Sequence, residues 1–168
     1  YFIKSFKKNI EVFDTPSYFK DIHKHHQIIH ETDLANNFGL YYKKYKKKLS
    51  KYMQDAIAKG NKHSGKDYAE AIDFMKRSYE SYKEVFEDYH GVLSPSSPGV
   101  APKGLKSTGT AEFNKFWSFM GTPCISLPLL QGENNLPLGV QLIGDKYDDQ
   151  RFLGIARWLE QKSKDYNE

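Results

Sequence analysis

The segment from Phe116 to Leu130, FWSFMGTPCISLPLL, constrains the fold of this chain more than any other. Its second part, CISLPLL, and the later run LGVQLIG are almost continuously apolar, and the turn-rich residues QGENNLP separate them. This pattern predicts a β-hairpin. Because neither strand alternates cleanly between apolar and polar residues, we expect both faces to be covered, as in the interior of a larger sheet. Cys124 and Ile125 are therefore expected in the sheet interior.

A third short strand is expected at GVLSP, which starts at Gly91. A sheet of about three strands has two open edges, which are poorly protected from pairing with other strands. We therefore expect association, as a homo-oligomer, with another chain, or with the remainder of a longer polypeptide. The first residue is Tyr rather than Met, and we expect the chain to begin inside a longer parent.

The residues before Gly91 predict helices. The first is expected to start at Asp14 or Thr15, with Pro16 in its first turn, and to end at Gly39. The second, LSKYMQDAIAKG, is expected to end at Gly60. Its apolar face comprises Leu49, Tyr52, Met53, Ala56 and Ile57.

The third helix is expected to follow a cap formed by Ser64 and Asp67. Its larger side chains recur at spacings of four and three, which indicates a buried seam. They are Tyr68, Ile72, Met75, Tyr79, Tyr82, Phe86 and Tyr89.

After Gly91, the Pro-rich run SPSSPGVAPKG predicts a loop. The run TAEFNKFWSFMG predicts a short helix with Thr110 as its cap and Gly121 as its end. A last helix, DQRFLGIARWLEQ, is expected after Asp148. The predicted fold class is α/β, with a helix-rich first half followed by a strand hairpin and a terminal helix.

Charge and cysteine content limit the partners that we expect. The chain of 168 residues has a net charge of +4, and its one Cys excludes an internal disulfide and is typical of a reducing compartment, so we expect a cytoplasmic location. No apolar run approaches the roughly 18 residues of a membrane span. The run KKYKKKLSK is Lys-rich, but it lacks a Gly-rich phosphate cradle or an RNA-binding aromatic motif. We therefore expect a solvated face, with no nucleic-acid or membrane partner.

The run HKHHQIIH places His26 and His30 four residues apart, so both could face one metal ion on a helix, with Asp33 nearby. No second cluster completes such a site. We expect no metal and no cofactor, and we keep a metal- or anion-binding helical protein as an alternative.

The two runs STGTAEFNKFWSFMGTPCISLPLL and LPLGVQLIGDKYDDQRFLGIARWLEQ resemble the C-terminal half of amidase signature enzymes. The shared features are a Thr-Gly followed by Phe-Asn, a Trp-x-x-x-Gly-x-Pro, a Ser-x-Pro strand, and a Pro-x-Gly-x-Gln-x-x-Gly strand before the closing helix. The resemblance implies a mixed β-sheet covered by helices. It also implies that residues 1–168 form the C-terminal portion of a single amidase-like domain.

This resemblance implies hydrolysis of C–N amide bonds by a Ser nucleophile, a second Ser in a cis peptide and a Lys base. In the family all three lie in the N-terminal half, and the two Ser residues lie in a Gly-Ser-Ser-Gly-rich loop. The only double Ser here, Ser96 and Ser97, stands between prolines and lacks that setting. We therefore expect no catalytic residue in this chain, and structural roles for Cys124 and Ser126. A truncated, non-catalytic amidase-like protein that associates with another chain is the main alternative.

The resemblance also implies that the Pro-rich loop and the segment Thr108–Trp117 lie near the substrate cleft. The substrate-binding candidates are Thr108, Gly109, Thr110, Phe113, Asn114 and Trp117. Many relatives carry Asp where this chain has Thr110. The implied ligand is a small-molecule amide, bound only together with the missing half, and the parent could be a stand-alone amidase or one component of an amidotransferase.

Overall fold

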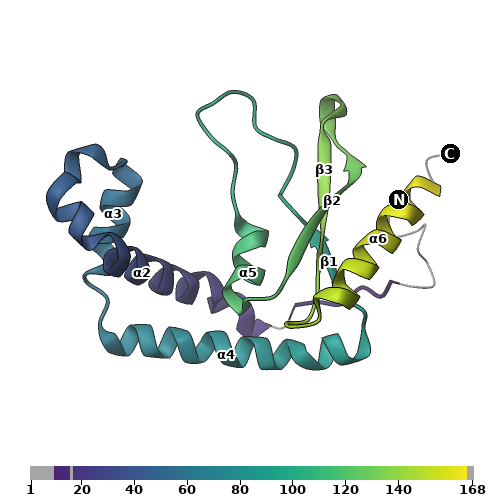
Figure 1. Ribbon diagram of the computed structural model, residues 1–168, viewed down its shortest axis with the longest axis horizontal. Coiled ribbons are helices and arrows are strands. Elements are labelled where there is room, and N and C mark those ends of the chain that lie inside the picture. Colours follow the sequence, from purple (N-terminus) through teal and green to yellow (C-terminus); the bar gives the residue numbers. More distant parts are fainter. Residues whose placement is uncertain (1–9, 16, 166–168) are drawn as a thin grey trace. The chain divides into compact units, whose positions relative to one another are not determined.

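The computed structural model describes residues 10–15 and 17–165 (Figure 1). These residues divide into two compact units, one that falls within Tyr1–Ser17 and Glu80–Glu168 and the other within Tyr18–Tyr79. The second unit is helical. Its elements are η1 (Ser17–Asp21), α2 (Ile22–Tyr45), η2 (Lys46–Lys48), α3 (Lys51–Gly60) and the first part of α4 (Gly65–Asp88).

Helix α2 is longer than the sequence pattern predicts. The prediction that it ends at Gly39 is wrong, because the helix continues through Gly39 to Tyr45. A single Gly costs a helix only about 1 kcal/mol, which the continuing backbone hydrogen bonds of the following turns can offset. At the other end, η1 begins at Ser17, and Pro16 lies outside the described residues.

The starts of α3 and α4 are capped by side chains. The backbone N–H of Met53 donates to Ser50 Oγ at 3.3 Å. At α4, the N–H of Asp67 donates to Ser64 Oγ at 3.1 Å and the N–H of Ser64 donates to Asp67 Oδ2 at 2.8 Å. This reciprocal pair confirms the predicted cap, which satisfies two backbone donors that the helix itself cannot bond.

Helices α2 and α3 lie side by side (Figure 1). Gly60, the last residue of α3, permits this packing, since a Cβ there would stand 1.9 Å from the carbonyl oxygen of Glu31. Ala56 and Ile57 are buried, as the sequence predicts for this face. Tyr52 was expected on the same face, but it is 65% exposed. Its ring reaches the surface, where its hydroxyl is 3.0 Å from Nε2 of His30.

The seam predicted along α4 is buried only in part. Tyr82 and Phe86 are in the core, whereas the four earlier residues of the seam are half-buried. The prediction for Tyr89 is wrong, because α4 ends at Asp88 and Tyr89 is exposed. Its hydroxyl donates a hydrogen bond to Glu11.

The other unit contains an antiparallel sheet with the strand order β1-β3-β2. The strands are β1 (Val92–Pro95), β2 (Cys124–Gln131) and β3 (Pro137–Ile143), and the turn η3 (Glu133–Asn135) connects β2 with β3. The predicted hairpin and the α/β fold class are thus confirmed. The pairing of β2 with β3 shifts register between Leu127 and Leu130, around Pro128, which has no N–H for the ladder.

Helix α6 (Asp149–Asp165) covers one face of the sheet (Figure 1). The core between them comprises Leu127, Leu142, Phe152, Ala156 and Leu159. On β2 burial alternates, and Cys124, Ser126 and Pro128 on the opposite face are exposed. The expectation of two covered faces therefore holds for Val140–Ile143 of β3 but is wrong for β2, because α6 covers only one face of that strand.

Helix α5 (Glu112–Met120) precedes β2. Its cap position is Ala111, which makes no side-chain bond, so the predicted Thr110 cap is wrong. Gly121 ends the helix in the left-handed conformation with φ 70°, as predicted. Over the described part of the chain, no helix is both long and apolar enough to cross a membrane.

Candidate functional site

A row of polar side chains crosses the sheet on the face opposite α6. Ser94 of β1 and Ser126 of β2 are both register partners of Gln141 on β3. Directly opposed residues of antiparallel strands point to the same face, so the three side chains share one side. Gln141 is 3% exposed, and its Nε2 donates to Ser94 Oγ at 2.8 Å. The buried amide thereby satisfies part of its hydrogen-bonding capacity.

Trp117 of α5 is held against this row. Its Nε1 donates to Ser94 Oγ at 3.2 Å, so one hydroxyl accepts from both the indole and the amide of Gln141. The ring centroids of Trp117 and Tyr82 are 5.3 Å apart, and those of Trp117 and Phe116 are 4.7 Å apart, both in edge-on geometry. These contacts fix the indole in one orientation.

The Ser126 hydroxyl meets one further hydroxyl, that of Ser96, on the same face. Ser96 Oγ and Ser126 Oγ are 2.7 Å apart above Gly139, where an added Cβ would lie 2.5 Å from one oxygen and 2.8 Å from the other. The backbone N–H of Ser96 also donates to the carbonyl of Gly139 at 3.0 Å. The absence of a side chain at Gly139 therefore permits the hydroxyl pair, which can donate to and accept from a polar ligand group.

An apolar cavity of about 640 Å³ lies next to β1. Its wall comes from Ile10–Thr15, α4, the three strands and α6, and Trp117 and Tyr82 contribute aromatic surface. Polar groups are few and include Ser94, Asp88 and His90. A cavity of this size and composition is typical of sites for small organic molecules.

Of the six substrate-binding candidates, only one lies at this cavity. Trp117 is buried and lines the cavity, whereas the other five do not line it. Thr108, Gly109 and Thr110 lie in the exposed loop before α5, where Gly109 has φ 85° and its N–H donates to Ser107 Oγ at 3.1 Å. Phe113 is half-buried and Asn114 is exposed on α5.

Sequence reasoning included Gly139 and Gln141 only as members of the Pro-x-Gly-x-Gln-x-x-Gly motif, and it named neither of them, nor Ser94, as a site residue. The turn pairs Gln131 with Pro137, and the register shift between Leu127 and Leu130 then brings Ser126 opposite Gln141, so strand spacing alone does not predict this pair. The position of Ser94 could not be read either, because β1 joins β3 across a long connection.

Cys124 is exposed, which corrects the expectation of a buried residue. Its Sγ is 3.6 Å from the carbonyl oxygen of Thr122. Partial burial of the sulfur raises the pKa of the thiol, and the contact with Thr122 offsets only part of this shift. A thiol in this state is a poor nucleophile at neutral pH.

The His-rich part of α2 makes hydrogen bonds and ring contacts. The rings of His26 and His30 stack with centroids 5.9 Å apart. Within residues 10–15 and 17–165, no three or more His, Cys, Asp or Glu side chains are grouped so that they could hold a metal ion.

Comparison with known proteins relates this chain to one protein family. The Amidase family model matches residues 2–153. A glutamyl-tRNA(Gln) amidotransferase component of Alkaliphilus metalliredigens is 36% identical over 103 residues, and fatty acid amide hydrolase of Arabidopsis thaliana is 26% identical over 126 residues. These alignments cover 56% and 68% of this chain and 21% of each relative, so the chain spans about a fifth of their length.

Solved structures agree at the level of the fold. A crystal structure of an amidase has a TM-score of 0.78 at 20% identity, and covers 95% of this chain and 41% of that chain. A bacterial aryl acylamidase of the amidase signature family has a TM-score of 0.74 at 14% identity, with 96% and 39% covered. From the family match over most of its length, supported by this shared fold, the chain belongs to the amidase family.

Proposed function

We propose that this chain is the C-terminal portion of an enzyme that hydrolyses amide C–N bonds. The single observation that carries the proposal is the family match over residues 2–153. The proposed catalytic groups are a Ser nucleophile, a second Ser in a cis peptide and a Lys base, contributed by a part of the protein outside this chain. The hydrogen bonds described for Ser96 and Ser126 support this assignment. The two hydroxyls bond to each other, and the N–H of Ser96 bonds to the backbone, whereas a nucleophile requires a hydrogen bond to a base.

In this proposal, Trp117 forms a wall of the acyl or amine pocket, and the loop with Thr108, Gly109 and Thr110 contributes to its rim together with Phe113 and Asn114. The fixed orientation of the indole supports the role of Trp117, because a rigid apolar wall positions a substrate at little entropic cost. The proposed partners are a small-molecule amide and the catalytic half of the protein, and the proposed location is the cytoplasm.

The first test measures amine or ammonia release from a panel of aliphatic and aryl amides. We expect no turnover from the isolated chain and turnover from the full-length parent protein. In the parent, Trp117→Ala should raise KM about tenfold or more, since an aromatic pocket wall contributes on the order of 1–3 kcal/mol to binding. Ser118→Ala, an exposed neighbour on α5, is the matched control and should leave KM unchanged.

Turnover by the repurified isolated chain above that of a heat-treated sample would contradict the proposed location of the catalytic groups. An unchanged KM in a folded Trp117→Ala parent would exclude Trp117 from the pocket wall.

A further inference from the structure

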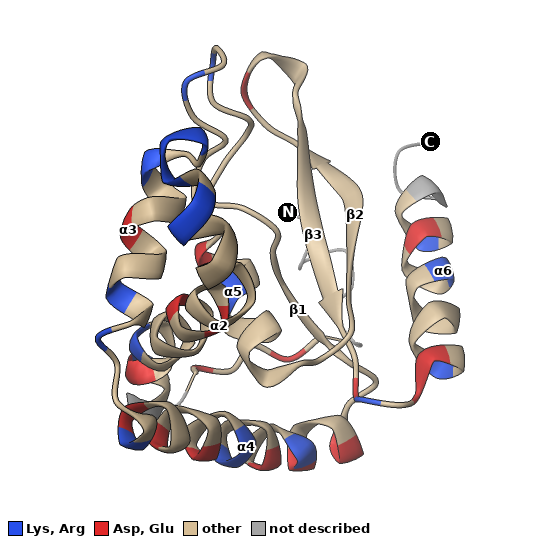
Figure 2. Cartoon of the chain, turned by 60° about the vertical axis from the view of Figure 1, so that its left-hand side comes forward, with Lys and Arg blue, Asp and Glu red and all other residues tan. Residues whose placement is uncertain are grey.

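The C-terminal end of α2 and the turn η2 carry a concentrated positive charge. Between Asp33 and Asp55 the sequence contains no acidic residue and six lysines, which are Lys43, Lys44, Lys46, Lys47, Lys48 and Lys51. Lys51 is paired with Asp55 at 2.8 Å, and the other five are exposed. Figure 2 shows them as a nearly continuous blue stretch that rounds the turn. This density of charge exceeds that of any other segment of the chain and favours a polyanionic partner.

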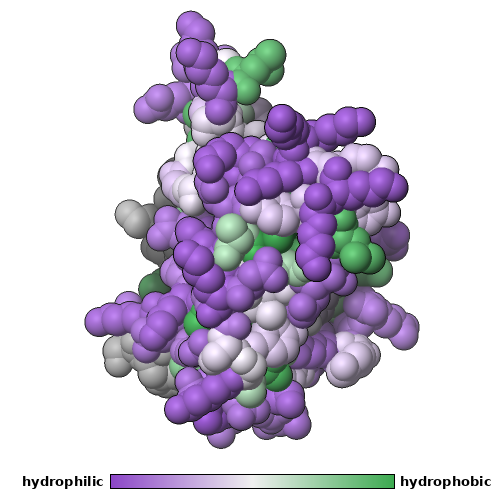
Figure 3. Space-filling view, turned by 90° about the vertical axis from the view of Figure 1, so that its left-hand side faces the viewer, coloured by the Kyte–Doolittle hydropathy of each residue, from purple (hydrophilic) through white to green (hydrophobic). Residues whose placement is uncertain are grey.

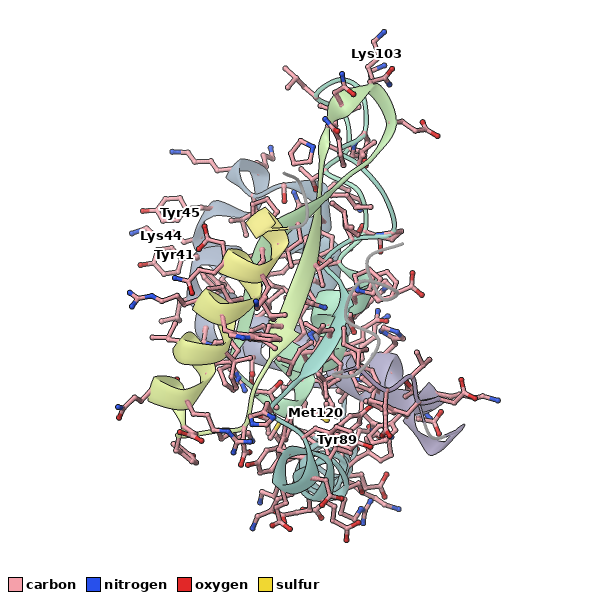
Figure 4. The ribbon with its side chains drawn as sticks, turned by 90° about the vertical axis from the view of Figure 1, so that its right-hand side faces the viewer. Tyr41, Lys44, Tyr45, Tyr89, Lys103 and Met120 are labelled. Atoms are coloured by element: carbon pink, nitrogen blue, oxygen red, sulfur yellow. The ribbon has the colours of Figure 1, made fainter. Side chains whose placement is uncertain are left out.

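Exposed aromatic rings run along the same segment. Phe38, Tyr41 and Tyr45 are spaced by three and four residues, so they fall within about 60° of one another on the helix. Their exposed fractions are 41%, 59% and 38%, and the ring centroids of Phe38 and Tyr41 are 6.3 Å apart. Figure 4 shows Tyr41, Lys44 and Tyr45 projecting together from the ribbon.

The lysines lie over ring faces. Nζ of Lys44 and of Lys48 are 5.3 Å and 5.5 Å from the ring centroid of Tyr45, and Nζ of Lys46 is 5.0 Å from that of Tyr42. At exposed sites such contacts contribute little, so they can be exchanged for stronger ones. A nucleic acid strand offers both replacements at once, because its phosphates attract the ammonium groups and its bases stack on the vacated rings.

A membrane surface fits the segment less well. Leu40 is 80% exposed, but it is two residues from Phe38 and therefore about 200° away on the helix, so the two cannot enter a bilayer together. On the face that Figure 3 shows, apolar side chains form small separate patches among hydrophilic ones. Insertion at an interface requires a continuous apolar face.

We propose that residues 38–48 bind single-stranded nucleic acid, with the lysines contacting phosphates and the Phe38, Tyr41 and Tyr45 rings stacking on bases. This revises the expectation of a merely solvated face. The Lys run is visible in the sequence, whereas the alignment of the three rings beside it depends on α2 continuing past Gly39. The proposed surface shares no residue with the proposed amidase site, and the proposal does not depend on that site.

The proposal is tested by fluorescence anisotropy of a labelled 12-nucleotide single-stranded RNA of mixed sequence, titrated with the chain at several KCl concentrations. We expect binding that weakens as salt rises. The Lys44→Gln/Lys48→Gln variant should flatten the slope of log K against log salt by about 1.4, since each contacted phosphate contributes about 0.7 for a single strand. Lys62→Gln/Lys76→Gln changes the charge equally at exposed positions elsewhere and should leave the slope unchanged.

Stacking is tested separately from charge. Tyr41→Leu/Tyr45→Leu keeps apolar bulk and helix-forming residues, and should weaken RNA binding roughly tenfold or more because it removes two stacking surfaces. Tyr147→Leu, at a tyrosine that is 98% exposed and close in sequence to three Asp residues, is the control and should have no effect. Circular dichroism verifies that each variant is folded. If the tyrosine variant does not fold, the folded lysine variant still tests whether the lysines contact phosphates.

Three results would overturn the proposal. One is the absence of salt-dependent binding to the RNA. A second is equal binding of RNA by the wild-type chain and a folded Tyr41→Leu/Tyr45→Leu variant, which would indicate a charge contact without stacking. The third is tighter binding to vesicles with 30% phosphatidylserine, at matched charge concentration, than to RNA, which would favour a membrane surface.

Discussion

At the scale of single residues, Cys124 combines an exposed position with a thiol whose pKa is raised. Partial burial of the sulfur disfavours the thiolate, although the residue lies on the uncovered face of β2. The raised pKa means that the thiolate forms only at a higher pH than in an unfolded chain. Accessibility and reactivity are therefore separate properties at this position.

We expect the pH midpoint for alkylation of Cys124 by iodoacetamide to be higher in the native chain than in the same chain in urea. Cys124→Ser should change the free energy of unfolding by less than about 1 kcal/mol, because the site is exposed and tolerates a hydroxyl. Alkylation rates across pH and urea denaturation measure the two quantities. A native midpoint below that of the unfolded chain would mean that a neighbouring group activates the thiol.

At the scale of elements, Glu31 joins α2 to the end of α3. Its side chain is 7% exposed and accepts hydrogen bonds from Gln27 Nε2 and His63 Nε2, each at 2.8 Å, with Lys59 Nζ at 3.7 Å. Burial by itself raises the pKa of this carboxyl, but the hydrogen bonds and the Lys59 charge outweigh it, and the pKa lies below its ordinary value of 4.5. The ionised form is thus the one that the folded state stabilises.

Because the folded pKa is lowered, the stabilisation is present above pH 4.5 and is lost as the pH falls through the folded value. Glu31→Gln should lower the free energy of unfolding by about 1–3 kcal/mol at pH 7, and the difference from wild type should shrink toward pH 3. Urea denaturation at both values measures this.

The control is Asp55→Asn, which breaks the exposed ion pair of Lys51 and Asp55 and should cost less than about 0.5 kcal/mol. If Glu31→Gln were equally destabilising at pH 3 and pH 7, packing rather than the carboxylate charge would hold the two helices together.

At the scale of the whole molecule, the described sheet has open edges at β1 and β2 and an uncovered face on β2. Unpaired strand edges pair readily with other strands. We expect the isolated chain to associate, and Ser126→Lys, which places a charge on the exposed face of β2, to reduce this association. Ser118→Lys on the exposed side of α5 is the matched control.

Light scattering coupled to size-exclusion chromatography, over a hundredfold dilution, measures the association. A wild-type chain that stays monomeric throughout would mean that its sheet edges are protected without a partner.

The sequence by itself predicted the ends of those elements that begin or end through contacts between residues close in the chain. The Ser64–Asp67 cap, the end of α5 at Gly121 and the hairpin around QGENNLP were all predicted, because each depends on contacts within a few residues. The motifs around Trp117 and Gln141 also indicated the family. Predictions failed where local preference was weak, as at Gly39, where the cost of one glycine is small compared with the stability of the continuing helix.

Tertiary structure decided what the sequence by itself could not. The hydroxyl of Ser94 meets Trp117 and Gln141 only because β1 pairs with β3 across a connection of more than forty residues. The exposure of Cys124 depends on α6 covering one face of the sheet and leaving the other face of β2 open, and the apolar pattern of CISLPLL does not encode which face is covered. Burial and cross-strand partners are set by packing between distant segments, whereas caps and turns are set by backbone geometry and hydrogen bonds within a single turn.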